Sequence, residues 1–186
     1  RTTAVNETIT LPLVNGFSYS FTVDWGDGTS SEITSYDDAD RIHTYAAAGD
    51  HTITIDGLLE AFSLDDTGDK NKLLSVPNLG DVGWKSFRNA FAGCANLTLV
   101  EGGITPNVTD MYGMFDGSPN AAPNGSTWDT SSVTGMWQMF RGAASANPHT
   151  SGWDTSNVTD MHRMFDAATS FNQPLHAPWY EDTGDY

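Results

Sequence analysis

The sequence has few of the groups that a disulfide framework, a nucleic-acid partner or a membrane span would require. It contains one cysteine, Cys94, so no internal disulfide can form. Eight Lys and Arg residues stand against 24 Asp and Glu residues, and the formal net charge of -16 repels nucleic acid and anionic membrane surfaces. No segment approaches the ~18 apolar residues of a membrane-spanning helix. We therefore expect no nucleic-acid partner and no direct membrane insertion.

Catalytic signatures are missing as well. The five histidines do not have zinc-binding spacing, and the sequence has no Gly-x-Ser-x-Gly, phosphate-loop or dinucleotide-binding motif. Carboxylate pairs are frequent in so acidic a chain, so a glycosidase pair is left open but has no specific support. We expect that the protein is not an enzyme.

The first residues predict a fragment of a longer protein. The chain begins at Arg1, with neither a methionine nor a leader of basic and then apolar residues. Its 186 residues suit one or two domains with a real hydrophobic core. We expect a mature or excised piece.

What the sequence does contain is a repeat. The octet Val-Thr-x-Met-x-x-Met-Phe occurs three times at a spacing of 25 residues, at 108–115, 133–140 and 158–165. The segment Trp-Asp-Thr-Ser recurs at the same spacing, at 128–131 and 153–156. A degenerate copy contains Phe87 and Phe91, and Trp179 stands one residue past the next expected tryptophan. A fixed period predicts stacked structural units.

The apolar positions of the octet predict a shared core. They fall at i, i+3, i+6 and i+7, which is one face of a short helix or 3-10 turn that is too short to be stable alone. Stacking would layer equivalent side chains: Met111 on Met136 on Met161, and Phe115 on Phe140 on Phe165. Trp128 and Trp153 are expected to pack at the corners between units.

The residues before the repeats read as β-structure. Apolar and polar side chains alternate in four short runs, at 8–13, 19–25, 41–46 and 51–56. Between them, Gly26-Asp27-Gly28 and Gly49-Asp50 have the composition of tight turns. The pattern predicts hairpins and a small β-sandwich.

Two family resemblances cover nearly the whole chain. Residues 23–29 (Val-Asp-Trp-Gly-Asp-Gly-Thr), followed by His43-Thr44-Tyr45 and Gly49, resemble PKD-like β-sandwich domains, which are common spacers in extracellular proteins. Residues 70–76 and the Trp-Asp-Thr-Ser-x-Val-Thr-x-Met-x-x-Met-Phe units resemble BspA-like leucine-rich-repeat surface proteins. The resemblance implies an α+β fold: a PKD-like sandwich at 1–57, then a short leucine-rich-repeat-like solenoid of ~25-residue repeats at 58–186. The two parts could be separate domains or could pack together as one unit.

Two sets of acidic residues are candidate cation sites. Asp24 and Asp27 could bind a cation or ligand, or could cap turns through backbone amides, which Asp-Gly chemistry alone explains. In the segment that lies between the two parts of the chain, side chains with oxygen atoms stand at every second position, at Asp65, Thr67, Asp69 and Asn71. This spacing resembles a calcium loop but lacks the glutamate and glycine positions of an EF-hand, so a polar linker is the alternative.

The variable positions of the octet predict a ligand surface. Stacking should align Tyr112, Trp137 and His162 as a ladder of ring-bearing side chains, with Gln138 and Arg163 beside it. Aromatic and arginine side chains are the usual anchors of interfaces. The alternatives are an ordinary exposed surface, a cover for the neighbouring sandwich, or a ligand surface on the strand side, near residues 146–147 and 171–173.

The resemblance implies an extracellular adhesion module of a larger bacterial surface protein. Its expected ligand is a peptide or protein on a host cell, neighbouring cell or matrix, and calcium dependence is a further expectation. A structural spacer without its own ligand and a carbohydrate-binding accessory module are the alternatives, because aromatic faces also stack on sugars.

Overall fold

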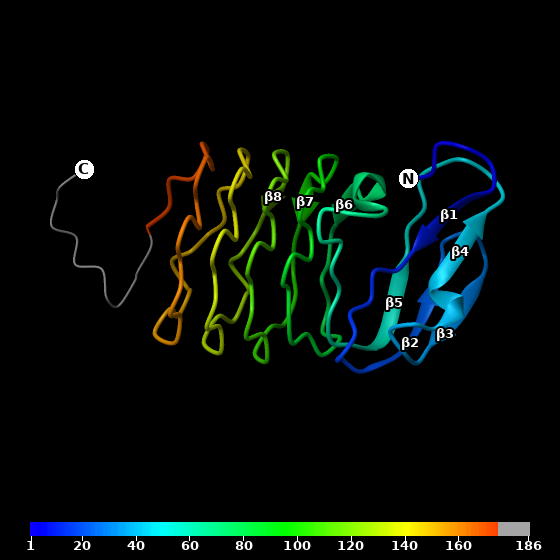
Figure 1. Cartoon of the computed structure of the whole chain (residues 1–186), viewed down its shortest axis with the longest axis horizontal. Helices are drawn as coiled ribbons and strands as arrows, with labels where there is room; N and C mark the ends of the chain where they lie inside the picture. Colours follow the sequence, from blue (N-terminus) through cyan, green and yellow to red (C-terminus); the bar gives the residue numbers. More distant parts are fainter. Residues whose placement is uncertain (175–186) are drawn as a thin grey trace, which may run out of the picture.

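The computed structural model describes residues 1–174 and shows an elongated molecule. Small antiparallel sheets occupy the N-terminal end, and the repeat units follow side by side along the long axis (Figure 1). Trp179, the expected start of a further unit, lies outside the described residues. Within residues 1–174, no helix has the length and apolar character needed to cross a membrane.

The N-terminal part contains two antiparallel sheets. Strand β1 (Glu7–Thr10) pairs with β4 (Ile42–Tyr45), which follows the 3-10 turn η1 (Ala39–Arg41). The second sheet has the order β3-β2-β5, with β2 at Tyr19–Asp24, β3 at Ser30–Ile33 and β5 at Thr54–Leu59. Alternate residues of β2 are buried, and the Tyr45 hydroxyl donates to the Trp25 carbonyl at 2.8 Å, which ties β4 to the end of β2.

The alternation of apolar residues located four of these five strands. The observed β1, β2, β4 and β5 overlap the expected runs, and β5 begins three residues later than predicted. Strand β3 has the sequence Ser-Ser-Glu-Ile, in which only Ile33 is buried, so it shows no apolar alternation to detect. Its pairing with β2 comes from the turn at 25–29, where the Trp25 amide donates to the Thr29 carbonyl at 3.0 Å.

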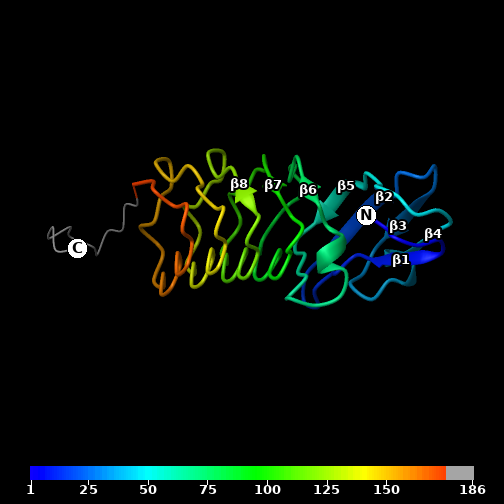
Figure 2. The same ribbon diagram turned by 90° about the horizontal axis from the view of Figure 1, so that it is seen from above.

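The repeats form four stacked units, which we define as unit 1 (84–107), unit 2 (108–132), unit 3 (133–157) and unit 4 (158–174). The 3-10 turn η2 (Lys70–Lys72) and strand β6 (Ser75–Val76) precede them. Strands β6, β7 (Leu99–Val100) and β8 (Ala122–Pro123) form a short parallel sheet along one side. Parallel bridges along the other side join equivalent residues, Ala61 to Ser86, Asp110, Gly135 and Asp160 in turn. Seen from above, the turns of successive units lie in one row (Figure 2).

Equivalent phenylalanines stack through the core, as the period predicts. The Phe115 ring lies 5.5 Å from Phe140 and nearly parallel to it, and Phe140 lies 5.3 Å from Phe165. Trp128 and Trp153 stack on each other at 6.1 Å, and each indole donates a hydrogen bond to a glycine carbonyl of the unit before. Buried tryptophan N–H groups need such partners.

The predicted fold class, α+β with a leucine-rich-repeat-like solenoid, was wrong. Residues 1–174 contain no α-helix, only two three-residue 3-10 turns, and the strands belong to small sheets. The residue before the second methionine of each octet has a positive φ: 57° at Gly113, 55° at Gln138 and 55° at Arg163. A left-handed residue ends a helical turn. Several amides of the octet donate to the next unit, as from Met111 to the Gly135 carbonyl at 2.9 Å, and others close turns within the octet, as from Met114 to the Met111 carbonyl at 3.3 Å.

The expected domain boundary, between residues 57 and 58, falls inside β5. One hydrophobic cluster runs through the N-terminal sheets and the repeats.

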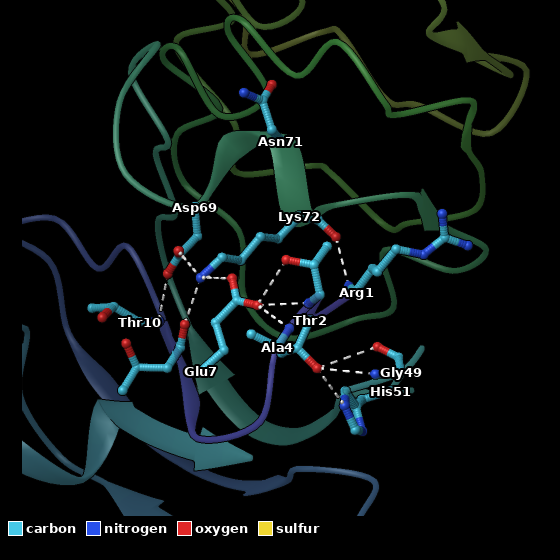
Figure 3. Close-up of polar contacts among 12 residues, drawn as sticks. Arg1, Thr2, Ala4, Glu7, Thr10, Gly49, His51, Asp69, Asn71 and Lys72 are labelled. Carbon is cyan, nitrogen blue, oxygen red and sulfur yellow. Dashed lines mark hydrogen bonds and ion pairs between the residues drawn. The ribbon is translucent and has the colours of Figure 1, made fainter. Parts of the chain in front are cut away.

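A polar junction also ties the N-terminal sheets to the repeats (Figure 3). The Lys72 ammonium contacts the Glu7 carboxylate at 2.9 Å and the Asp69 carboxylate at 2.8 Å. Asp69 also accepts from the Thr10 amide of β1 at 2.8 Å. The first strand is thereby held against the segment that leads into the repeats.

Acid should weaken this junction. The Lys72 ammonium, together with the Thr3 amide, lowers the pKa of Glu7 from its ordinary 4.5 to about 2. A carboxyl group with a depressed folded-state pKa stabilises the fold above its unfolded pKa, and this stabilisation is lost as the pH falls through the folded pKa. We expect Glu7→Gln to be less stable than the parent at pH 7, with the difference shrinking between about pH 4.5 and 2. Urea unfolding at several pH values measures this difference.

The matched control is Glu32→Gln, which removes an exposed carboxylate away from the junction. Glu32→Gln should have little effect on the free energy of unfolding at any pH between 7 and 2. A deficit of Glu7→Gln that stays constant from pH 7 to pH 2 would contradict the assigned role of the Glu7 charge.

Candidate binding surface

The repeat positions the variable side chains in a fixed way. In units 2 and 4, the third residue of the octet caps the turn that carries the predicted ladder residue: the Asp110 carboxylate accepts from the Tyr112 amide at 2.8 Å, and Asp160 accepts from the His162 amide at 2.9 Å. Unit 3 has Gly135 at this position, which has no side chain to cap the turn. Short Asp side chains stabilise turns in this manner. Ser86 plays the same part for Arg88 in unit 1, at 3.2 Å. The side chains at this position therefore occur once per unit, in register.

Three of these side chains are in contact. The Tyr112 and Trp137 rings meet edge to face, with centroids 4.6 Å apart. The Arg88 guanidinium lies 4.0 Å from the centroid of the Tyr112 ring, in a cation–π arrangement. We call this row of Arg88, Tyr112 and Trp137 the aromatic ladder.

The other predicted ligand-binding residues are placed differently. His162 is exposed and, within the described residues, its ring makes no ring contact with Trp137. Arg163 is also exposed, whereas Gln138 is buried with 6% of its surface accessible. The expectation that Gln138 lies on the surface was wrong. Unit 4 packs on unit 3 at this position, where the Gln138 amide donates to the His162 carbonyl at 3.0 Å, whereas the exposed Arg163 lies in the last described unit.

A groove of about 690 Å³ adjoins the ladder at the junction of the sheets and the repeats. One wall is apolar and comes from Val14, Phe17 and Phe62. Other lining residues come from units 1 and 2 and include Arg88 and Asp110. A volume of this size suits a small molecule or the side chains of a bound peptide.

The charges in the groove are mostly paired. Arg88 contacts Asp110 at 3.2 Å, and the Lys85 ammonium contacts the nearly buried carboxylate of Glu60 at 2.5 Å. Asp65 at the groove edge accepts a hydrogen bond from the neutral Asn89 amide at 2.7 Å and, within residues 1–174, pairs with no cation.

The sequence did not predict the groove, although the repeat pattern indicated one of the residues that line it. Arg88 occupies the ladder position of the degenerate copy, so the repeat alone signals it. Phe17 and Phe62 belong to irregular segments that reach the repeats only in three dimensions. Nothing in their local sequence indicates that they share a wall.

The four residues of the expected calcium loop take separate partners. Asp65 binds Asn89, the Thr67 hydroxyl donates to the Leu64 carbonyl at 2.9 Å, and Asp69 binds Thr10 and Lys72. The backbone carbonyl of Asn71 accepts from the Asn96 side-chain amide at 2.8 Å. Across residues 1–174, no group of three or more His, Cys, Asp or Glu side chains is arranged to hold a metal ion. These contacts favour a structural junction over a calcium loop.

The carboxylates near the first hairpin cap its turn. Asp24 accepts from the Gly26 amide at 2.8 Å. Asp27 accepts from the Thr29 hydroxyl at 2.6 Å and pairs with His43 at 2.8 Å, and these bonds lower the pKa of Asp27 to about 2. Their contacts are those of turn-capping residues.

Two further features of the stack serve its packing. Cys94 is fully buried, and burial raises the pKa of its thiol to about 12, which disfavours the nucleophilic thiolate. On the side named as the alternative ligand surface, the Asn147 amide donates to Asn172 at 3.1 Å and accepts from the Asn172 backbone at 3.1 Å. Those amide groups join units, so the ladder and groove are the better candidate surface.

Comparison with known proteins gives one family match. No curated protein matches the chain, and no solved structure does. The family described as "Mycoplasma protein of unknown function, DUF285" matches residues 85–183, a span that includes the repeat units and is more than half of the 186-residue chain. The parallel stack and its aromatic ladder are thus features of the matched region, and the chain belongs to the DUF285 family.

Proposed function

We propose that this chain is an extracellular adhesion module of a BspA-like bacterial surface protein, and that it binds a peptide or protein ligand. The single observation that carries the proposal is the continuity of the aromatic ladder with the groove. Arg88 belongs to both: it lines the groove, and its guanidinium lies on the Tyr112 ring. Aromatic and arginine anchors beside an apolar groove are typical of protein interaction sites.

The shape of this surface favours an extended ligand. The ladder advances by one side chain per unit, from Arg88 to Tyr112 to Trp137, so it offers regularly spaced contacts along the stack. Arrays of stacked repeats present such repeated positions to extended partners. The edge-to-face packing of Tyr112 and Trp137 leaves no broad flat ring pair, which favours a peptide over a stacked sugar.

The test is capture on a peptide array and a glycan array, in calcium and in chelator. We expect the wild-type chain to capture peptides, and the double variant Tyr112→Ala, Trp137→Ala to lose this capture. Tyr112 and Trp137 are only half-buried, and their ring contact contributes about 1 kcal/mol in addition to the area they bury, so we expect the double variant to remain folded at the assay temperature. Circular dichroism during heating verifies this.

The matched control is Tyr36→Ala, which removes an aromatic ring that is 39% exposed in the N-terminal part of the chain. It should capture the same peptides as the parent. Unchanged capture by the double variant would refute the site. Failure of the wild type to capture any peptide would support the structural spacer, and capture of glycans alone would support the carbohydrate-binding module.

A further inference from the structure

We propose that the groove selects peptides in which a lysine or arginine stands next to an apolar residue, with Asp65 binding the cation and the Phe17–Phe62 wall binding the apolar side chain. This inference rests on the proposed function, because it specifies the ligand of the same surface. It is carried by the contacts of the groove residues and by the charge balance of the chain.

The apolar wall is held in place before any ligand binds. The Tyr19 hydroxyl accepts from the Val14 amide at 2.8 Å, and it lies 2.9 Å from the Val14 carbonyl and 3.1 Å from the Ala61 carbonyl. This hydroxyl joins the two segments that carry the wall. The Phe62 ring packs against the buried Phe91 ring of unit 1 at 5.8 Å. A wall fixed in this way loses little conformational entropy when an apolar side chain settles on it.

The two cations of the groove are already neutralised. Lys85 is held by Glu60, whose side chain is only 9% exposed, so this carboxylate is available to Lys85 but scarcely to a ligand. Arg88 is held between Asp110 and the Tyr112 ring. An anionic ligand would have to compete with these internal partners.

Asp65 is the groove carboxylate that remains available. Its backbone is left-handed, with φ at 46°, and its amide donates to the Asn89 carbonyl at 3.1 Å. The Asn89 side-chain amide donates back to Oδ1 of Asp65 at 2.7 Å. These two bonds orient the carboxylate without neutralising it, since Asn89 is uncharged. A ligand cation placed there would gain a charge-assisted hydrogen bond, which is stronger than a neutral one.

The charge of the whole chain favours the same ligand. Six of the eight basic side chains form ion pairs with carboxylates of the chain itself, at Arg1, Lys70, Lys72, Lys85, Arg88 and Arg141. With 24 acidic residues, carboxylates remain in large excess. The resulting negative field accelerates the approach of cationic partners and repels anionic ones.

The test compares captured peptides with altered versions of themselves. Each dodecapeptide that the wild type captures is printed again with Lys and Arg replaced by Glu, and again with its apolar residues replaced by Ser. We expect both replacements to abolish capture. For a captured peptide in solution, fluorescence anisotropy should show a Kd about tenfold higher for Asp65→Asn than for the wild type, the size expected when a charged hydrogen bond becomes a neutral one.

Asp65→Asn is a conservative variant. Asn tolerates positive φ, and its side-chain oxygen can still accept from Asn89. The control Asp37→Asn removes the same charge from an exposed residue outside the groove, so it changes the net charge equally, and its Kd should match the wild type. A second measurement needs no variant: addition of the peptide to isotopically labelled wild-type protein should shift the amide resonances of Phe17, Phe62 and Asp65.

The outcomes separate the two proposals. Equal Kd values for Asp65→Asn and Asp37→Asn, capture of the Glu-substituted peptides, or unshifted groove resonances would overturn the inference. The proposed function would stand in these cases if the Tyr112→Ala, Trp137→Ala variant still lost capture. If the wild type captures no peptide at all, the proposed function and this inference both fail.

Discussion

Replacing Phe140 with Ala is expected to lower the free energy of unfolding by about 3–5 kcal/mol, the usual cost of truncating a buried phenylalanine. Phe140 is fully buried and stacks on Phe115 on one side and Phe165 on the other. It also lies 6.3 Å from the Trp153 ring, which packs parallel to it. The cavity would open between two rigid layers that are joined by backbone hydrogen bonds, so the neighbours could not collapse into it.

Chemical denaturation followed by tryptophan fluorescence and circular dichroism measures this loss. The matched control is Phe165→Ala, the equivalent residue of unit 4, which stacks on Phe140 but is partly exposed. Because part of its surface already contacts solvent, its replacement should cost clearly less. Equal losses at the two positions would contradict the idea that enclosure between units makes Phe140 critical.

Replacing Gly26 with Ala is expected to lower the free energy of unfolding by about 2–5 kcal/mol, the sum of a strained backbone and a steric clash. Gly26 has a φ of 77°, in the left-handed region that favours glycine. A Cβ atom there would collide with the backbone carbonyl oxygen of Thr52, in the segment that leads into β5. Backbone cannot rotate away as a side chain can, so β2 and β5 would have to separate locally.

The same turn contains an internal control. Gly28 has a φ of 91°, but a Cβ atom there would meet nothing within 4 Å. Gly28→Ala should therefore show the conformational cost alone, about 1–2 kcal/mol. Thermal and urea unfolding of both variants gives the difference. If Gly28→Ala costs as much as Gly26→Ala, contact with Thr52 is not what requires glycine at position 26.

The candidate site was predictable in part. The positions of Tyr112 and Trp137 follow from the repeat, since equivalent residues of stacked units become neighbours, and their rings are in contact. The repeat does not reveal that Gln138 is buried, because the equivalent Arg163 has the same left-handed backbone and is exposed. The expectation of a helical turn failed because residues 113, 138 and 163 have left-handed backbones, which Gln and Arg rarely adopt.

The predicted calcium loop shows a second limit of prediction from sequence. The spacing of Asp65, Thr67, Asp69 and Asn71 indicates only that oxygen atoms are available. Which partners they take depends on residues that the sequence places far away, such as Thr10, 59 positions before Asp69. Asn89, 24 positions after Asp65, donates to that carboxylate, and only folding brings these two residues close.

By itself, the sequence determined the period of the units, the turns of the first hairpin and the identity of the buried Met, Phe and Trp residues. These depend on local spacing and on the free energy of burying apolar groups, both of which can be read along the chain. Only the tertiary structure decided that the octets form turns without helices, and that two parts of the chain enclose a groove. It also decided that Asp65 keeps its charge unpaired there, because hydrogen bonds between stacked units and contacts between distant segments outweigh local propensity.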